Sequence, residues 1–305
     1  MLDDRFKILA LIGHGRWSST FKAIDTSTGR TVVVKVPPRH LGNTLHLREA
    51  QIGSRLDHPG VLRFVPTDDR SKSRPYLVTE YLEGHSLQDE LERAGSLPVA
   101  DALSLCARLC DALDYLHRHH IVHADVKPGN IMLCVDGSLR VIDFGIARLT
   151  QGAFSGHVGT PEYMAPEQVK GKRGDARTDL YALGATLYEM ITARRPFDTL
   201  PEDDRMNARL VGDPVAPSRY VPGLSPEVEE IILRALARRP ADRYPSAAAM
   251  KADLVAPERV VVTGLASRLQ VPVLAKLWWR IAALLGLCLI IPVVLFFVFL
   301  AFLRK

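Results

Sequence analysis

The chain has few cysteines, and their arrangement does not suit a disulfide framework. Only four occur among 305 residues, at the irregularly spaced positions Cys106, Cys110, Cys134 and Cys288. Small secreted domains that depend on disulfides carry a higher density of them. Cys106 and Cys110 lie four residues apart in a predicted helix, but no second ligand pair accompanies them, so two packed thiols are favoured over a metal site. The cysteines therefore indicate a reducing compartment.

The sequence also predicts no secretory signal, no internal repeat and no extended basic surface. The N-terminal residues MLDDRFKILALIGHG begin with acids and contain only a short apolar run. The formal net charge is +5, but residues 256–305 hold six Lys or Arg against one acid and account for all of it. Residues 1–255 are thus about neutral, which argues against nucleic acid as a partner.

One long run near the C-terminus lacks charge altogether. No charged residue occurs in the 23 positions of 281–303. With a rise of about 1.5 Å per residue, a helix of this length crosses a hydrocarbon core about 30 Å thick. Trp278 and Trp279 beside Arg280 are typical of a membrane interface. We expect a transmembrane helix over 281–303 that contacts the lipid bilayer, after a juxtamembrane linker over 257–280. A buried soluble helix is the less favoured alternative, because little sequence follows that could pack around it.

The remaining sequence divides into a β-rich part and a helix-rich part. Short β-branched runs alternate with turns at 6–12, 18–24, 31–36, 61–65 and 75–80. One helical pattern, over 43–56, interrupts them. After Gly84 the periodicity is mainly helical, most clearly over 98–119, 177–191, 225–237 and 245–254. The sequence therefore predicts an α+β fold, with a small sheet domain followed by a larger helical one.

A glycine-rich turn and a strand lysine are candidates for phosphate binding. Gly13, Gly15 and Ser18 lie in the run IGHGRWSSTFKA between two predicted strands. Glycines let backbone N–H groups approach phosphate oxygens, although such a turn alone is more often a plain hairpin. Lys35 follows in the run TVVVKV, and Glu49 on the next predicted helix is placed to reach its ammonium. That pairing would hold Lys35 against the α- and β-phosphates, whereas an isolated strand lysine would face solvent.

The most informative segment is IVHADVKPGNIML, which lies between a long predicted helix and a β-type run. In it, Asp125 can accept the proton of an attacking hydroxyl, and Lys127 can neutralise a moving phosphoryl group. Asn130 can bind a metal through its amide oxygen. Thirteen residues further, the run RVIDFGIA supplies Asp143, a second hard oxygen ligand suited to Mg²⁺.

Together these segments resemble the ordered motif set of the eukaryotic-type (Hanks-type) serine/threonine protein kinase family, in a bacterial-like form. The motifs GHGRWS, VVVK, HADVKPGN, DFG and GTPEYMAPE follow one another in order within residues 6–254. The resemblance implies a bilobal fold. It implies an N-lobe over 1–83, with a five-stranded antiparallel sheet and one helix, and a mainly helical C-lobe over 84–256. ATP with Mg²⁺ or Mn²⁺ would bind between them.

The resemblance also implies roles for individual residues. Asp125 and Lys127 are the catalytic residues, and Asn130 and Asp143 are the metal ligands. The implied ATP-binding residues are Ile12, Gly13, Gly15, Ser18, Thr20, Val33, Lys35, Glu49, Glu80, Leu82 and Met132. Within this set, Glu80 to Leu82 form the adenine hinge after a small gatekeeper, Thr79. Structural roles are implied for Asp179, for Gly184 and for an ion pair between Glu167 and Arg243.

The acceptor and the regulation can be inferred in part. DVKPGN with GTPEYMAPE resembles the branch that phosphorylates protein Ser or Thr, and Thr150, Ser155 and Thr160 are the candidate activation-loop sites. The family's usual His-Arg-Asp is His123-Ala124-Asp125 here, so the arginine that grips a phosphorylated loop is missing. We expect activity to depend less on loop phosphorylation than in kinases that have this arginine.

ATP and reduced thiols belong to the cytosol, so we expect a single-pass protein of the inner cell membrane with its catalytic domain in the cytoplasm. A homodimer that phosphorylates itself in trans stays open. Two alternatives compete: a membrane-tethered pseudokinase scaffold, and a kinase of lipids, sugars or antibiotics. The presence of Lys35, Asp125 and Asp143 argues against the first, and the GTPEYMAPE segment argues against the second.

Overall fold

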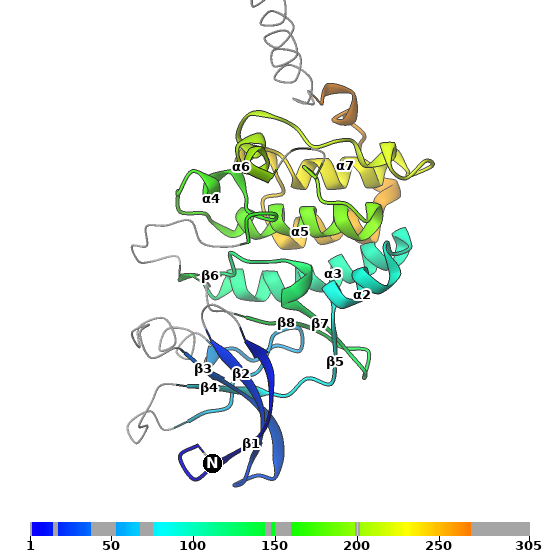
Figure 1. Ribbon diagram of the computed structural model, residues 1–305. Helices are drawn as coiled ribbons and strands as arrows, with labels where there is room; N and C mark the ends of the chain where they lie inside the picture. The colour runs from blue at the N-terminus through cyan, green and yellow to red at the C-terminus, as the bar shows by residue number, and fades with distance from the viewer. Residues whose placement is uncertain are drawn as a thin grey trace, which may run out of the picture.

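Two lobes lie end to end in the computed structural model, a β-sheet lobe that begins at the N-terminus and a larger helical lobe (Figure 1). The structure describes residues 2–14, 18–37, 53–67, 76–143, 148–149, 160–198, 200 and 202–269. Most of the helix predicted over 43–56 lies outside these residues. The α+β fold with an antiparallel N-terminal sheet and a helical second lobe agrees with the prediction.

The N-lobe is built on one antiparallel sheet. Its strands are β1 (Phe6–His14), β2 (Ser19–Asp25), β3 (Arg30–Val36) and β4 (Leu77–Glu80), in the order β1-β2-β3-β4. Side chains alternate across β3, so Val32, Val34 and Val36 are buried in the lobe's own core. Val33 and Lys35 therefore share the opposite face of the sheet.

The prediction of a fifth strand over 61–65 was wrong for this part of the chain. Phe64 bridges Thr79 of β4, and the Val65 N–H donates to the Val78 carbonyl at 2.8 Å, but no regular strand forms. Pro66 follows at once, and a proline has no N–H with which to extend the pairing. The described residues of the N-lobe thus form a four-stranded sheet to which this segment adds isolated contacts.

The C-lobe is mainly helical. Its described helices are α2 (Leu87–Ala94), α3 (Val99–Arg118), α4 (Pro166–Val169), α5 (Ala176–Thr192), α6 (Glu202–Val211), α7 (Pro226–Ala235) and α8 (Ala247–Val255). They confirm the four helices that the periodicity predicts. Helix α5 is buried along most of its length and packs against α3 and α7. A Cβ atom on Gly184 would lie 2.6 Å from the Ala235 Cβ, so this glycine lets α5 and α7 approach closely.

Short strands near the junction of the lobes place the loops that carry the chemistry. Strands β5 (Gly84–Ser86), β7 (Ile131–Cys134) and β8 (Leu139–Val141) form one small sheet, and β6 (Ile121–Val122) pairs with β9 (Arg148–Leu149). Residues 123–130 connect β6 to β7, and residues 142–143 follow β8 directly. Strand pairing therefore fixes both ends of the segment that contains Asp125 and Asn130.

The chain beyond α8 lies against the C-lobe. The buried carboxylate of Glu230, on α7, accepts the backbone N–H groups of Thr263 at 3.1 Å and Leu265 at 3.2 Å. It also accepts the Thr263 hydroxyl. The first half of the predicted linker is therefore folded onto α7. Across the part of the chain that the structure describes, no helix combines the length and apolar composition needed to cross a membrane, and residues 281–303 lie outside that part.

Candidate active site

Asp125 lies at the centre of the segment between β6 and β7 and is only 8% exposed. One carboxylate oxygen, Oδ1, accepts the Thr160 N–H at 2.8 Å. The other, Oδ2, lies 2.9 Å from the Lys127 ammonium and accepts the Asn130 amide N–H at 3.0 Å. Lys127 also donates to the Thr160 hydroxyl. The structure thus brings Asp125, Lys127, Asn130 and Thr160 into one hydrogen-bonded group.

A second buried carboxylate holds the backbone beneath this group. Asp179, on α5, has no exposed surface and accepts the N–H groups of His123 at 2.9 Å and Ala124 at 2.8 Å. His117, on α3, lies 2.8 Å from the same carboxylate. Ala124 has a φ of +64°, a conformation that non-glycine residues adopt only when the surroundings impose it. Asp179 imposes it here by fixing two successive N–H groups, which sets the direction of Asp125.

His123 joins the two segments that carry the candidate catalytic and metal residues. Its Nδ1 accepts the Asp125 N–H at 3.3 Å, so the ring proton must reside on Nε2. Nε2 then donates to the Ile142 carbonyl at 3.1 Å. Ile142 directly precedes Asp143, which has a φ of +67°. The histidine therefore couples the position of the Asp143 backbone to that of Asp125.

Lys35 and Asp143 meet across the junction of the lobes. The Lys35 ammonium lies 3.4 Å from Asp143 Oδ1, and the Lys35 side chain is 16% exposed against 47% for Asp143. Thr20 on β2 lies directly opposite Lys35, so the two residues share one face of the sheet. Glu49, the predicted carboxylate partner of Lys35, lies outside the described residues.

Asn130 and Asp143 fit a hard divalent cation. The Asn130 amide nitrogen donates to the Asp125 carbonyl at 2.8 Å and to its carboxylate, which assigns the amide oxygen as the atom for a cation. Mg²⁺ is commonly held by one or two protein oxygens together with substrate phosphates and water. The described residues contain no cluster of three or more His, Cys, Asp or Glu that could hold a metal ion.

The predicted nucleotide residues lie on both lobes. Val33 on β3 and Met132 on β7 are half-buried, Leu82 packs at the edge of the main core, and Ile12 on β1 is 49% exposed. Gly13 pairs with Thr20 across β1 and β2. Ser18 directly precedes β2, and Glu80 ends β4, where its carboxylate accepts the Arg63 N–H at 2.9 Å. The predicted residues Gly15, Glu49, Thr150 and Ser155 lie outside the described part.

Residues 160–165 form a segment that runs directly past Asp125, and we call it the acceptor platform. Its first residue is Thr160, described above. Its Tyr163 donates to the Glu189 carboxylate on α5 at 2.5 Å. Burial raises the pKa of Tyr163 and also that of Glu189. The phenol therefore remains protonated and serves as the donor of this bond.

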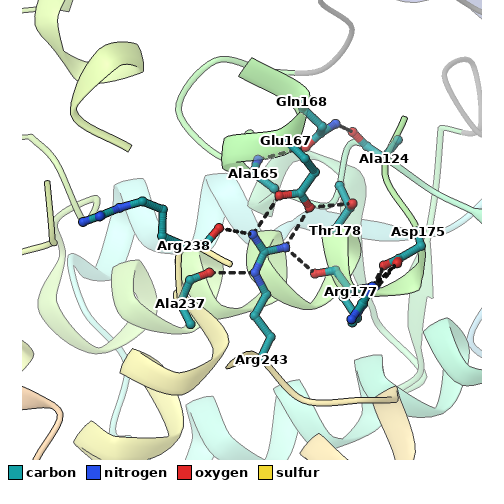
Figure 2. Close-up of polar contacts among 10 residues, drawn as sticks. All are labelled: Ala124, Ala165, Glu167, Gln168, Asp175, Arg177, Thr178, Ala237, Arg238 and Arg243. Atoms are coloured by element: carbon teal, nitrogen blue, oxygen red, sulfur yellow. Dashed lines mark hydrogen bonds and ion pairs between the residues drawn. The ribbon is translucent and has the colours of Figure 1, made fainter. Parts of the chain in front are cut away.

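The helix after the platform is held by the ion pair that the sequence predicts (Figure 2). Both Glu167 oxygens accept from the Arg243 guanidinium, at 2.7 and 2.8 Å, and Thr178 donates to Glu167 at 2.8 Å. Arg243, whose side chain is fully buried, also donates to the carbonyls of Arg177 and Ala237. Every polar group of this pair drawn in Figure 2 thus has a partner, which a buried ion pair requires.

The structure also reveals site residues that sequence reasoning missed. The Lys22 ammonium lies 4.2 Å from the ring centre of Tyr81, which follows Glu80 in the hinge. Gln168 and Arg209 bond to the backbone around the acceptor platform. The bond between Gln168 and Ala165 has the three-residue spacing of a helix cap, which is a signal that the sequence offered. The other partners are backbone carbonyls or a ring distant in sequence, so residue spacing could not identify them.

Comparison with known proteins agrees with this geometry. Residues 6–255 match the model of the protein kinase domain. The serine/threonine-protein kinase PknB of Mycobacterium leprae is 36% identical over 267 residues, which cover 83% of this chain and 43% of PknB. The probable serine/threonine-protein kinase CE0033 of Corynebacterium efficiens is 37% identical over 272 residues, which cover 83% and 41% respectively. PknB of Mycobacterium tuberculosis is 36% identical over 270 residues, with 83% and 43% covered. The chain spans less than half the length of these curated relatives.

Proposed function

The chain belongs to the protein kinase family, and from that premise we propose that it transfers the γ-phosphate of ATP to Ser or Thr hydroxyls of protein substrates. The observation that carries this proposal is the hydrogen-bonded group of Asp125, Lys127, Asn130 and Thr160 beside Lys35 and Asp143. The names of the relatives, each a serine/threonine-protein kinase, support the choice of acceptor.

Asp125 serves as the group that receives the proton of the acceptor hydroxyl. Three donors, from Thr160, Lys127 and Asn130, hold its carboxylate in one orientation. A positioned general base typically contributes 10²- to 10⁴-fold to the rate, so these contacts set where the hydroxyl must lie. The Lys127 ammonium lies beside the same carboxylate, where it stabilises negative charge on the transferred phosphoryl group.

The nucleotide is held from both lobes. Lys35 supplies a fixed cation to the phosphates, and Asn130 and Asp143 supply oxygen ligands to Mg²⁺ or Mn²⁺. When bound, the cation neutralises phosphate charge that builds up during transfer. Val33 and Met132 supply apolar surface for the adenine, and the backbone of Glu80 to Leu82 supplies its hydrogen bonds. Gly13, Ser18 and Thr20, at the adjoining ends of β1 and β2, would contribute to binding of the phosphates.

A protein acceptor is favoured over a small molecule because of the acceptor platform. The Thr160 N–H binds Asp125 directly, so a chain that places its hydroxyl at Asp125 must run along residues 160–165. Lys127 donates to the Thr160 hydroxyl and Tyr163 donates to Glu189, and these side-chain bonds hold the segment, in which residues 161–163 form a turn, beside Asp125. A kinase of sugars or antibiotics has no need for such a surface.

We further propose that residues 281–303 tether the domain to the inner membrane, with the catalytic domain in the cytoplasm. The support is the 23-residue stretch without charge and the two tryptophans before it. A homodimer that phosphorylates itself in trans would follow naturally from confinement to a membrane plane. The runner-up function is a membrane-tethered pseudokinase scaffold, which keeps the fold and the nucleotide without transfer.

Two experiments test these proposals separately. Residues 1–269 are incubated with γ-labelled Mg-ATP and a generic basic protein, and the phosphorylated amino acids are identified. Label on Ser or Thr supports the kinase, and bound ATP without transfer supports the pseudokinase. For the tether, the full chain and residues 1–269 are expressed in bacteria, and membranes are washed with alkaline carbonate. Retention of the full chain alone supports the tether, and release of both contradicts it.

A further inference from the structure

The acceptor platform is held by two side chains to which the kinase motifs assign no role. Gln168 lies on α4 and Arg209 on α6, so they approach the platform from different elements. Both are buried, with 7% and 3% of their surface exposed. Each bonds to main-chain atoms, and these bonds depend on the path of the backbone rather than on the identity of the residues bound.

Gln168 ties the end of the platform to the catalytic loop (Figure 2). Its amide nitrogen donates to the Ala124 carbonyl at 2.9 Å, and its amide oxygen accepts the Ala165 N–H at 2.9 Å. Ala124 directly precedes Asp125 and has the left-handed backbone described above. One side chain therefore bridges the residue before the catalytic carboxylate and the last residue of the platform.

Arg209 ties the middle of the platform to α6. Its guanidinium donates to the Glu162 carbonyl at 2.6 Å and to the Arg205 carbonyl of its own helix at 3.0 Å. The same guanidinium lies 5.3 Å from the ring centre of Phe197, which packs beside it. A buried arginine is costly to desolvate, and burial lowers the pKa of Arg209. Bonds to carbonyls and an aromatic face offset that cost.

We infer that Gln168 and Arg209 are positioning residues for the protein acceptor, acting through the backbone of the platform. The inference rests on the proposed function, because the platform is the surface along which the acceptor chain must run to reach Asp125. With Thr160 bound to Asp125 at one end, Glu162 fixed by Arg209 and Ala165 fixed by Gln168, three backbone points set the path of that surface.

The test compares matched variants of residues 1–269 by steady-state kinetics with a Ser-containing peptide. Arg209→Gln removes the contact with Glu162, and Arg205→Gln is its control. Arg205 lies one turn earlier on α6, and its side chain bonds to the Leu200 carbonyl and lies near the Asp198 carboxylate. The Arg205 carbonyl that Arg209 reaches belongs to the backbone and is kept in this variant. Gln168→Met removes both amide bonds at similar volume, and Gln88→Met on α2, which removes a side-chain hydrogen bond to Glu92, is its control.

For Arg209→Gln and Gln168→Met we expect the peptide KM to rise roughly tenfold, as for the loss of one or two buried hydrogen bonds. The ATP KM and the rate of acceptor-free ATP hydrolysis should stay within about twofold of wild type, since the atoms around ATP keep their contacts. Arg209→Lys, which can still donate to one carbonyl, should recover part of the lost peptide affinity. Both control variants should behave as wild type.

Two results would overturn the inference. One is an unchanged peptide KM in both variants. The other is an equal loss in peptide KM, ATP KM and acceptor-free hydrolysis together with a lowered melting temperature, which would indicate a structural role only. A wild-type protein that binds ATP but transfers no phosphate would instead refute the proposed function, so the two failures can be told apart.

Discussion

The two halves of the candidate site are held in different ways. In the C-lobe, Asp125 and the backbone before it are fixed by hydrogen bonds with the buried side chains of Asp179 and Asn130 and with the Thr160 N–H. In the N-lobe, Lys35 extends from a strand and meets Asp143 across the junction, at 3.4 Å and with the Asp143 side chain half exposed. The difference indicates that the position of Asp125 is fixed within the C-lobe, whereas the contact between Lys35 and Asp143 depends on how the lobes meet.

The largest effect should come from breaking the buried ion pair between Glu167 and Arg243 in the C-lobe. Arg243→Met leaves the Glu167 carboxylate buried and without its cation. We expect the free energy of unfolding to fall by roughly 3–5 kcal/mol, the usual cost of removing one partner of a buried ion pair. Urea denaturation of residues 1–269 measures it. Arg239→Met removes a cation whose side chain is 79% exposed and should change stability by less than about 0.5 kcal/mol. A similarly small change for Arg243→Met would contradict the claim that this ion pair stabilises the C-lobe.

In the N-lobe, the contact between Lys35 and Asp143 can be removed without unfolding the protein. Lys35→Met removes the cation that faces Asp143 and should lower kcat/KM for ATP roughly a hundredfold, a typical loss for one electrostatic contact to the transition state. Its free energy of unfolding should stay within about 1 kcal/mol of wild type. Lys7→Met, on the exposed side of β1, is the matched control. Full activity in Lys35→Met would contradict the proposal that this lysine binds the ATP phosphates.

The smallest effect should come from the activation-loop candidates. Ala124 stands where the family has an arginine, so a loop phosphate lacks that partner. We expect the double substitution Thr150→Ala and Ser155→Ala to change kcat by less than about threefold, because Ala124 has no guanidinium that could bind a loop phosphate. Rates of phosphatase-treated and autophosphorylated protein should likewise agree. An inactive dephosphorylated protein that regains activity on phosphorylation would refute this expectation.

Much of this arrangement could be predicted because it depends on local patterns. The β-branched run TVVVKV placed Lys35 in a strand, and helical periodicity located α3, α5, α7 and α8. The pairing of Glu167 with Arg243 followed from resemblance to the family rather than from spacing. The strand predicted over 61–65 did not form because its bridges are divided between two strands, with Val61 opposite Val141 of β8 and Phe64 opposite Thr79 of β4.

Other contacts could not be predicted, because one partner is a backbone atom or because the loop path decides the encounter. His123 reaches the Ile142 carbonyl, Gln168 reaches Ala124, and Arg209 reaches Glu162, each across a long sequence separation. Glu230 binds two N–H groups of residues 263–265, which the sequence assigned to a linker of undefined structure. Composition and periodicity carry no signal for bonds of this kind.

The most direct test of the account is the turnover number of Asp125→Asn at saturating ATP and peptide. Asparagine keeps the shape of the side chain and can still accept the Thr160 N–H, but it cannot receive the hydroxyl proton. We predict that kcat falls roughly 10²- to 10⁴-fold with little change in the ATP KM. A kcat within about tenfold of wild type, in protein of unchanged melting temperature, would contradict the assignment of Asp125 as the catalytic carboxylate.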